Sequence, residues 1–191
     1  MKKYLPLLLL LTACASTPPN ENARAQVDYE RVVSANTRSA NKYSGLYQTF
    51  QASATLLNTE LQTAALKLRG DYSGWDAAAA QKERDRTFQD MAATTKVFLR
   101  FYSPENDYDD LHKPTSIWKI YLEHEGRRIL GTVKKLTDKF VELQMLYPHM
   151  DRFSSPYEVT FPVPTTSVEG AEVKVYLTSS LGSAEFTFPP K

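Results

Sequence analysis

Cysteine and histidine have the most reactive side chains in this chain, and both are scarce. The 191 residues contain one cysteine, Cys14, and three histidines, His112, His124 and His149. A single cysteine excludes an internal disulfide and a cysteine-rich metal site. Its thiol is still a nucleophile, so Cys14 is the first candidate for covalent chemistry.

The residues before Cys14 are organised like an export signal. Lys2 and Lys3 supply positive charge, and an apolar run interrupted by Pro6 extends over residues 4–11. A run of about eight residues is too short to cross a bilayer core as a helix, which takes about 20 residues. It fits the apolar region of a signal peptide. A plain signal peptide that happens to contain a cysteine and a buried N-terminal strand are the alternatives.

The sequence Leu11-Thr12-Ala13-Cys14 resembles the lipobox of bacterial lipoprotein precursors, in which an aliphatic and two small residues precede an obligatory cysteine. The small side chains let the backbone enter a peptidase site, and the thiol accepts a diacylglyceryl group as a thioether. The resemblance implies that signal peptidase recognises Leu11, Thr12 and Ala13. It implies cleavage after Ala13 and lipid attachment at Cys14.

Lipidation would hold the mature chain at a membrane without a spanning helix, because two or three acyl chains anchor stably. Ala15 follows the cysteine in place of the aspartate that retains enteric lipoproteins at the inner membrane. The resemblance therefore favours the outer membrane of the bacterial envelope, with the body in the periplasm. We expect residues 1–13 to be the signal peptide and residues 14–20 a lipidated tether, which spans at most about 20 Å.

The composition describes a globular protein with balanced charge. Hydrophobic residues make up 42% of the chain, which is enough for a core and excludes a wholly disordered protein. The 23 basic and 22 acidic residues leave no basic excess, and removing Lys2 and Lys3 changes the net charge from +1 to −1. We expect no nucleic-acid partner.

No metal or other cofactor is predicted. His124 lies between Glu123 and Glu125, and neighbouring residues of a strand point to opposite faces, so these three cannot converge on one ion. The stretch 105–110 has alternate carboxylates like the start of a calcium loop, but the sixth position is not glycine and the twelfth is Ser116. We interpret this stretch as a solvated linker.

The motifs of common enzyme classes are missing from the sequence. It contains no Gly-x-Ser-x-Gly, no glycine-rich phosphate loop and no His-Glu-x-x-His. We therefore expect a non-catalytic protein. A hydrolase that uses carboxylates such as Glu142 and Glu158 is an alternative, although nothing in the sequence places those two together.

The elements that must position any site divide into two regions. Residues 21–95 are expected to be helical: an early helix spans about 21–35, and apolar residues spaced by three or four predict a long helix from about residue 39 or 44 to Gly70. This stripe comprises Leu46, Phe50, Ala54, Leu57, Leu61, Ala64 and Leu68. Ser73 and Asp76 predict a capping box that opens another helix.

Residues 96–191 have the period of two that is typical of strands. Alternating segments begin near residues 97, 118, 129, 141, 157, 173 and 186, with polar turns between them. We expect an α+β protein in which N-terminal helices precede an antiparallel β-sandwich of about seven strands. In strand number and size the sandwich resembles an immunoglobulin-like domain. A partly open barrel is the alternative.

These observations favour a lipid-anchored, non-catalytic module that holds or assists a protein partner in the envelope. The alternative is binding of cell-wall glycan or another envelope polymer through exposed aromatic residues. Tyr43 and Tyr47, one turn apart on the predicted helix, are expected to belong to the core, as is Trp118. We interpret the loop 147–153 as a connection between strands, with a binding role as the alternative.

Overall fold

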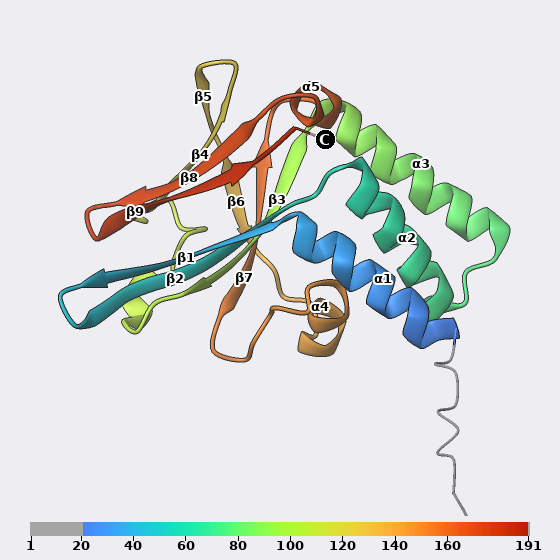
Figure 1. Ribbon diagram of the computed structural model, residues 1–191, viewed down its shortest axis with the longest axis horizontal. Coiled ribbons are helices and arrows are strands. Elements are labelled where there is room, and N and C mark those ends of the chain that lie inside the picture. Colours follow the sequence, from blue (N-terminus) through green and yellow to red (C-terminus); the bar gives the residue numbers. More distant parts are fainter. Residues whose placement is uncertain (1–20, 191) are drawn as a thin grey trace, which may run out of the picture.

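The computed structural model describes residues 21–190 and packs helices against two antiparallel sheets (Figure 1). The helices are α1 (Glu21–Ala35), α2 (Thr59–Ser73), α3 (Ala77–Ala93), α4 (Phe140–Leu146) and α5 (Thr165–Glu169), with a short 3-10 turn at Asn106–Tyr108. The strands are β1 (Thr37–Ser44), β2 (Tyr47–Leu56), β3 (Thr95–Tyr102), β4 (Lys119–His124), β5 (Arg127–Leu130), β6 (Thr132–Lys135), β7 (Ser155–Phe161), β8 (Val173–Ser179) and β9 (Gly182–Phe188). The predicted α+β class is confirmed.

The strands form a five-stranded sheet in the order β1-β2-β3-β7-β6 and a four-stranded sheet in the order β5-β4-β8-β9. β5 and β6 are separated by Gly131 alone, so residues 127–135 pair with β4 in one sheet and with β7 in the other. On the opposite side the edge strands β1 and β9 face each other, and Arg38 Nε donates to the Thr187 carbonyl at 2.9 Å. The sheets are therefore linked along both sides. The comparison with an immunoglobulin-like domain is not confirmed.

The main core lies between the two sheets. Alternate side chains of each strand point into it, as expected for sheets with one buried face. On β2 these are Phe50, Ala52, Ala54 and Leu56, and on β8 they are Val173, Val175 and Leu177. Trp118 contacts the rings of Phe50 and Phe101, so its prediction as a core residue is confirmed.

A second core lies between the helices and the outer face of the five-stranded sheet. It contains Tyr29 and Val33 of α1, Leu61 of α2 and Leu143 of α4, packed around Phe98 of β3. The helices thus form a third layer over one sheet (Figure 1).

The expected helical region 21–95 is wrong between Thr37 and Leu56, where a β-hairpin replaces the first part of the long helix. The spacing of Phe50 and Ala54 misled the prediction, because four residues are about one helical turn and also two strand repeats. Polar residues alternate with the apolar ones on this strand, as at Gln51 and Ser53, and show the period of two. As a consequence the strand-rich part does not begin at residue 96.

Two further predictions need correction. The segment beginning at Val141 forms the helix α4, whose buried residues Leu143 and Leu146 are spaced by three. Asp76 is the N-cap of α3, and Gly74 in the left-handed conformation, rather than Gly70, ends α2. The helix at 21–35 and the strands near residues 97, 118, 129, 157, 173 and 186 are confirmed.

Candidate functional site

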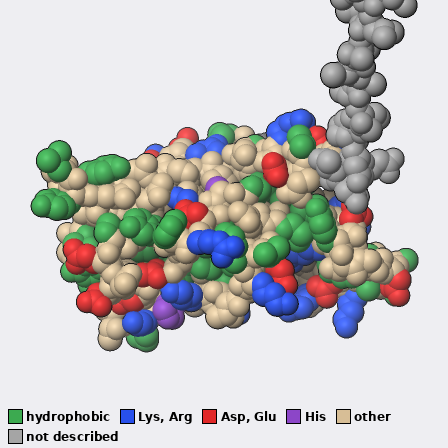
Figure 2. Space-filling model, turned by 90° about the horizontal axis from the view of Figure 1, so that it is seen from below, with side chains coloured by type: hydrophobic (Ala, Val, Ile, Leu, Met, Phe, Trp, Pro, Cys, Tyr) green, Lys and Arg blue, Asp and Glu red, His purple; other side chains and the backbone are tan. Residues whose placement is uncertain are grey.

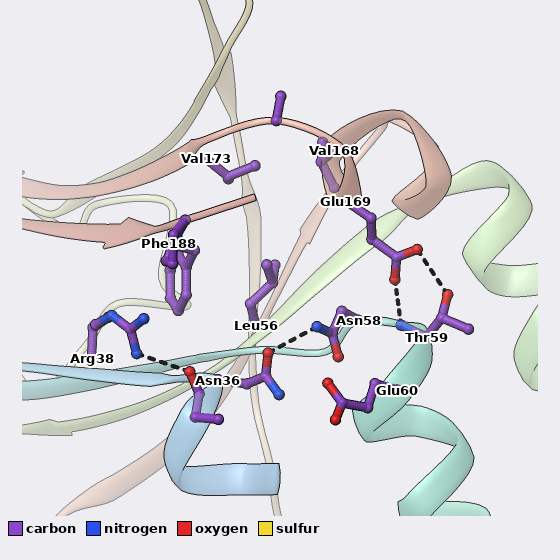
Figure 3. A pocket seen from close by; sticks show the side chains of 13 residues that line it. Asn36, Arg38, Leu56, Asn58, Thr59, Glu60, Val168, Glu169, Val173 and Phe188 are labelled. Atoms are coloured by element: carbon purple, nitrogen blue, oxygen red, sulfur yellow. Dashed lines mark hydrogen bonds between the residues drawn. The ribbon is translucent and has the colours of Figure 1, made fainter. Parts of the chain in front are cut away.

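A cavity of about 380 Å³ lies where the helical layer meets the ends of both sheets (Figure 3). Its volume falls within the range typical of small-molecule sites, roughly 300–1,000 Å³. The walls come from the end of α1, the start of α2, α5 and the ends of β2, β8 and β9. The lining residues are Ala35, Asn36, Arg38, Leu56, Asn58, Thr59, Glu60, Val168, Glu169, Ala171, Val173, Phe188 and Pro189.

The apolar part of the wall is firmly packed. Leu56, Val168, Val173 and Phe188 belong to the core between the sheets and are almost completely buried. Close packing holds such side chains in single rotamers. The cavity therefore has a preformed apolar wall.

Two buried asparagines hold the helix ends that border the cavity. Asn58 is the N-cap of α2, and its Oδ1 accepts from the Leu61 main-chain N–H at 3.0 Å. Its Nδ2 donates to Oδ1 of Asn36 at 2.8 Å, and Nδ2 of Asn36 donates to the Val32 carbonyl at 2.8 Å. This chain of hydrogen bonds joins the end of α1 to the start of α2.

Glu169 closes another side of the cavity. One oxygen of its carboxylate accepts from the Thr59 main-chain N–H and the other from the Thr59 hydroxyl, at 3.0 Å (Figure 3). The start of a helix carries unpaired N–H groups and partial positive charge, which favour a carboxylate there. The contact ties α5 to α2 and is typical of helix-end stabilisation.

Arg38 provides a positive charge on the side opposite Glu169 (Figure 3). Its Nη1 donates to the carbonyls of Ala35 and Thr37, and its guanidinium lies 5.5 Å from the centre of the Phe188 ring. The cavity thus combines an apolar wall with a cation at one side and the carboxylates of Glu60 and Glu169 at the other. Such a lining suits binding of a mainly apolar group.

The lipobox residues Leu11, Thr12, Ala13 and Cys14 lie outside the described residues. None of the helices within residues 21–190 combines the length and the apolar character needed to span a bilayer. In the same part of the chain, no group of three or more His, Cys, Asp or Glu side chains is placed to hold a metal ion.

The three histidines lie in separate places. His112 is exposed, and its ring centre lies 5.9 Å from that of Tyr157. His124 is buried at the end of β4 with Nδ1 unpaired among the described atoms. His149 packs edge-on against Phe98 beside Arg100. Burial and the positive charge of Arg100 lower the pKa of His149 to about 4.

Arg100 is a buried cation that fastens the loop after α4 to the outer face of the five-stranded sheet. Its Nη1 donates to the His149 carbonyl at 3.1 Å and to the Asp151 carboxylate at 2.7 Å. Tyr147 of the same loop stacks on Phe98 of β3, and burial raises the pKa of Tyr147 to about 12. The loop 147–153 thus has a packing role over most of its length, while Phe153 at its end is exposed.

The acidic stretch 105–110 contributes contacts to the fold through its last two residues. The Asp109 carboxylate accepts from Lys135 Nζ at 3.0 Å, from Ser155 and from the Tyr157 hydroxyl at 2.9 Å. Asp110 accepts from the Ser116 hydroxyl at 2.9 Å. The prediction of a merely solvated linker is wrong for these residues.

The remaining predicted residues do not form a site together. Glu142 on α4 and Glu158 on β7 line two different hollows, and each lies 3.8 Å from a lysine. Tyr43 and Tyr47 lie at the closed end of the β1–β2 hairpin and are exposed, so their prediction as core residues is wrong.

No protein-family model, curated protein or solved structure matches this chain. The cavity residues were missed because they come from residues 35–60 and 168–189, which only the tertiary fold brings together. One local signal was present. Asn58 followed by Thr59 and Glu60 is a helix start, which would have divided the long predicted helix.

Proposed function

We propose that this protein is a lipid-anchored, non-catalytic interaction module of the bacterial envelope. Lipid on Cys14 would hold it at the outer membrane, and its body in the periplasm would take up an apolar group of a protein partner. The observation that carries the binding part of the proposal is the cavity beside Asn36 and Asn58. The anchoring part rests on the lipobox resemblance.

The chemistry of the lining favours binding over catalysis. The one hydroxyl among the lining side chains, that of Thr59, donates to Glu169, and the same carboxylate accepts from the Thr59 main chain. Because both oxygens of the carboxylate are engaged by a helix start, this pair supports packing of α5 on α2. The apolar wall can bury a side chain of a partner, and the charges on either side can orient the segment that carries it.

The position of the cavity also suits a partner. Figure 1 shows α5 and the end of β9 at the upper side of the molecule, away from the point where the chain enters α1. A body held by its N-terminus would leave this side accessible. Polymer binding has weaker support, because Phe188 is the single aromatic residue of the lining and its ring is buried.

The test is photo-crosslinking in the native cell. A photoreactive amino acid replaces Ala171 in the full-length chain, which carries a C-terminal tag, and Leu130 on β5 serves as the matched control position. We expect a stoichiometric protein adduct from position 171 and none from position 130. Ala171→Phe, which fills the cavity, removes the partner in a pull-down. Equal adducts from both positions, or recovery of glycan without protein, would overturn the proposal.

The anchor is tested separately with Cys14→Ser. The wild-type chain partitions into the detergent phase in processed form, and the variant remains an unprocessed precursor without lipid. A variant that partitions like the wild type would contradict lipidation at Cys14.

A further inference from the structure

Nine large apolar side chains among the described residues are exposed, and five of them lie on the β1–β2 hairpin, on α4 and just before β7. The other four are Val27, Tyr72, Ile117 and Leu130. The closed end of the β1–β2 hairpin presents Tyr43, Leu46 and Tyr47, which are 61%, 98% and 82% exposed. Val141 on α4 is 73% exposed and Phe153, just before β7, is 86% exposed. A contiguous group of exposed apolar side chains, such as the one at the hairpin end, indicates a contact surface. We call these five residues the apolar points.

The apolar points lie on elements that face the side from which the chain enters the body. In Figure 1, α4 and the loop leading into β7 form the lower edge, the hairpin end lies at the left, and the chain enters α1 at the lower right. Figure 2 views the molecule from below and shows hydrophobic side chains at its left end and across its middle. The tether that the sequence predicts at residues 14–20 would reach about 20 Å. A short tether to a lipid therefore keeps this side near the membrane.

A cationic residue lies close in sequence to each of the three places that carry the apolar points. Lys42 precedes Tyr43, Lys139 lies two residues before Val141, and Arg152 precedes Phe153. The hairpin carries Arg38 and Lys42 and has no acidic residue along its length. Arg152 also covers the ring of Phe140 at 4.7 Å. Aromatic and aliphatic side chains beside Lys or Arg are the residues that settle at a membrane surface, where the cations meet lipid phosphates.

The arrangement favours a planar occupant. A groove on a protein partner would need one contiguous patch, whereas the apolar points are convex and belong to separate elements. A lipid surface can take up several separate protrusions at once. The hairpin end alone, residues 43–47, is also too small for the roughly 800 Å² that each partner contributes to a stable protein interface.

We propose that the apolar points rest in the headgroup region of the membrane that holds the chain, so that the body lies along the bilayer. This inference rests on the proposed lipid anchor for its orientation. The hairpin end and Phe153 then form two contacts that fix the body, and the cavity beside α5 is turned away from the lipid.

The test places single cysteines in the full chain at Leu46→Cys, Phe153→Cys and the matched control Leu130→Cys. Leu130 is the last residue of β5 and is likewise exposed, at 54%. Each cysteine is labelled with an environment-sensitive fluorophore, in vesicles of phosphatidylethanolamine and phosphatidylglycerol that contain lipid-borne quenchers. We expect quenching at positions 46 and 153 to exceed that at position 130 by about threefold or more. Equal quenching at the three positions would overturn the proposal.

The parent chain separates this result from the anchor. A thioether at Cys14 cannot react with the label, so labelling of the parent chain would show that the lipid is missing and that the proposed anchor fails. The same three positions are then measured in the Cys14→Ser background with added vesicles. Preferential quenching at 46 and 153 there supports the apolar points on their own, and its absence there as well overturns them.

Discussion

Gly131 passes so close to Val159 that a Cβ atom on the glycine would lie 2.5 Å from Cγ1 of the valine. The same atom would lie 2.7 Å from Cε1 of Phe161. Gly131 is where residues 127–135 leave one sheet and enter the other, with its N–H donating to the Ile120 carbonyl at 2.8 Å. The absence of a side chain is what allows the strand to bend over β7.

Gly131→Ala should therefore lower the free energy of unfolding by about 1–3 kcal/mol, the usual cost of overpacking a core. Gly170→Ala is the matched control, because a Cβ there meets nothing within 4 Å and its φ is −84°. Urea denaturation followed by circular dichroism measures both variants. Equal stability of the two would contradict the steric role of Gly131.

Glu169→Gln should lower the free energy of unfolding by about 1 kcal/mol, because the charge that faces the start of α2 is lost. The amide can still accept one of the two hydrogen bonds from Thr59. Glu172→Gln removes an exposed carboxylate that lies 3.8 Å from Lys174, and its effect should stay below about 0.5 kcal/mol. Thermal unfolding of the two variants side by side gives the comparison.

Tyr157→Phe should destabilise the protein by about 1–2 kcal/mol, since the part-buried Asp109 contacts lose a hydrogen-bond donor. The Tyr157 hydroxyl donates to the main-chain carbonyl and the carboxylate of Asp109 at 3.0 and 2.9 Å. Tyr72→Phe, at an exposed position on α2, should change the stability by less than about 0.5 kcal/mol. An effect of Tyr157→Phe no larger than that of Tyr72→Phe would contradict a structural role for Asp109.

His149 should make the fold less stable as the pH falls. Its pKa is about 4 in the folded protein against 6.5 for an unperturbed histidine, so the unfolded chain binds a proton first. The stability is complete above pH 6.5 and is lost as the pH falls toward 4, by up to about 1.4 kcal/mol per pH unit. Denaturation of the wild type and His149→Gln between pH 7 and pH 4 measures this contribution. If both chains lose stability in parallel, the slope belongs to other groups.

Much of the fold could be predicted where the spacing of the apolar residues fits the period of a helix or that of a strand, but not both. Val173, Val175 and Leu177 alternate with polar residues, and β8 lies there. Phe50 and Ala54 fit both the helical and the strand period, and only the polar residues between them distinguish a strand from a helix. At α4 the alternation of Val141, Leu143 and Met145 was accidental, because only Leu143 of these three is buried.

The candidate site could not be predicted in the same way. Thr59 and Glu169 are separated by 110 positions and come together only when α5 packs on α2. Their residue types carry no motif, since a carboxylate at a helix start is recognisable only once the two helices are placed. Cys14 is the opposite case, because the lipidation predicted there depends only on the residues directly before it in the sequence.

The direct junction of α1 and β1 determines how the body would respond to mechanical force. One residue, Asn36, separates the helix from the strand, which leaves the end of the helix at an angle (Figure 1). Tension applied at Glu21 would act along β1, which pairs with β2 through eight residues. Because the hydrogen bonds of an antiparallel pair lie across the strands, such a load shears them together and does not open them one by one. The β1–β2 pair would therefore oppose a load along β1 with all of its hydrogen bonds at once.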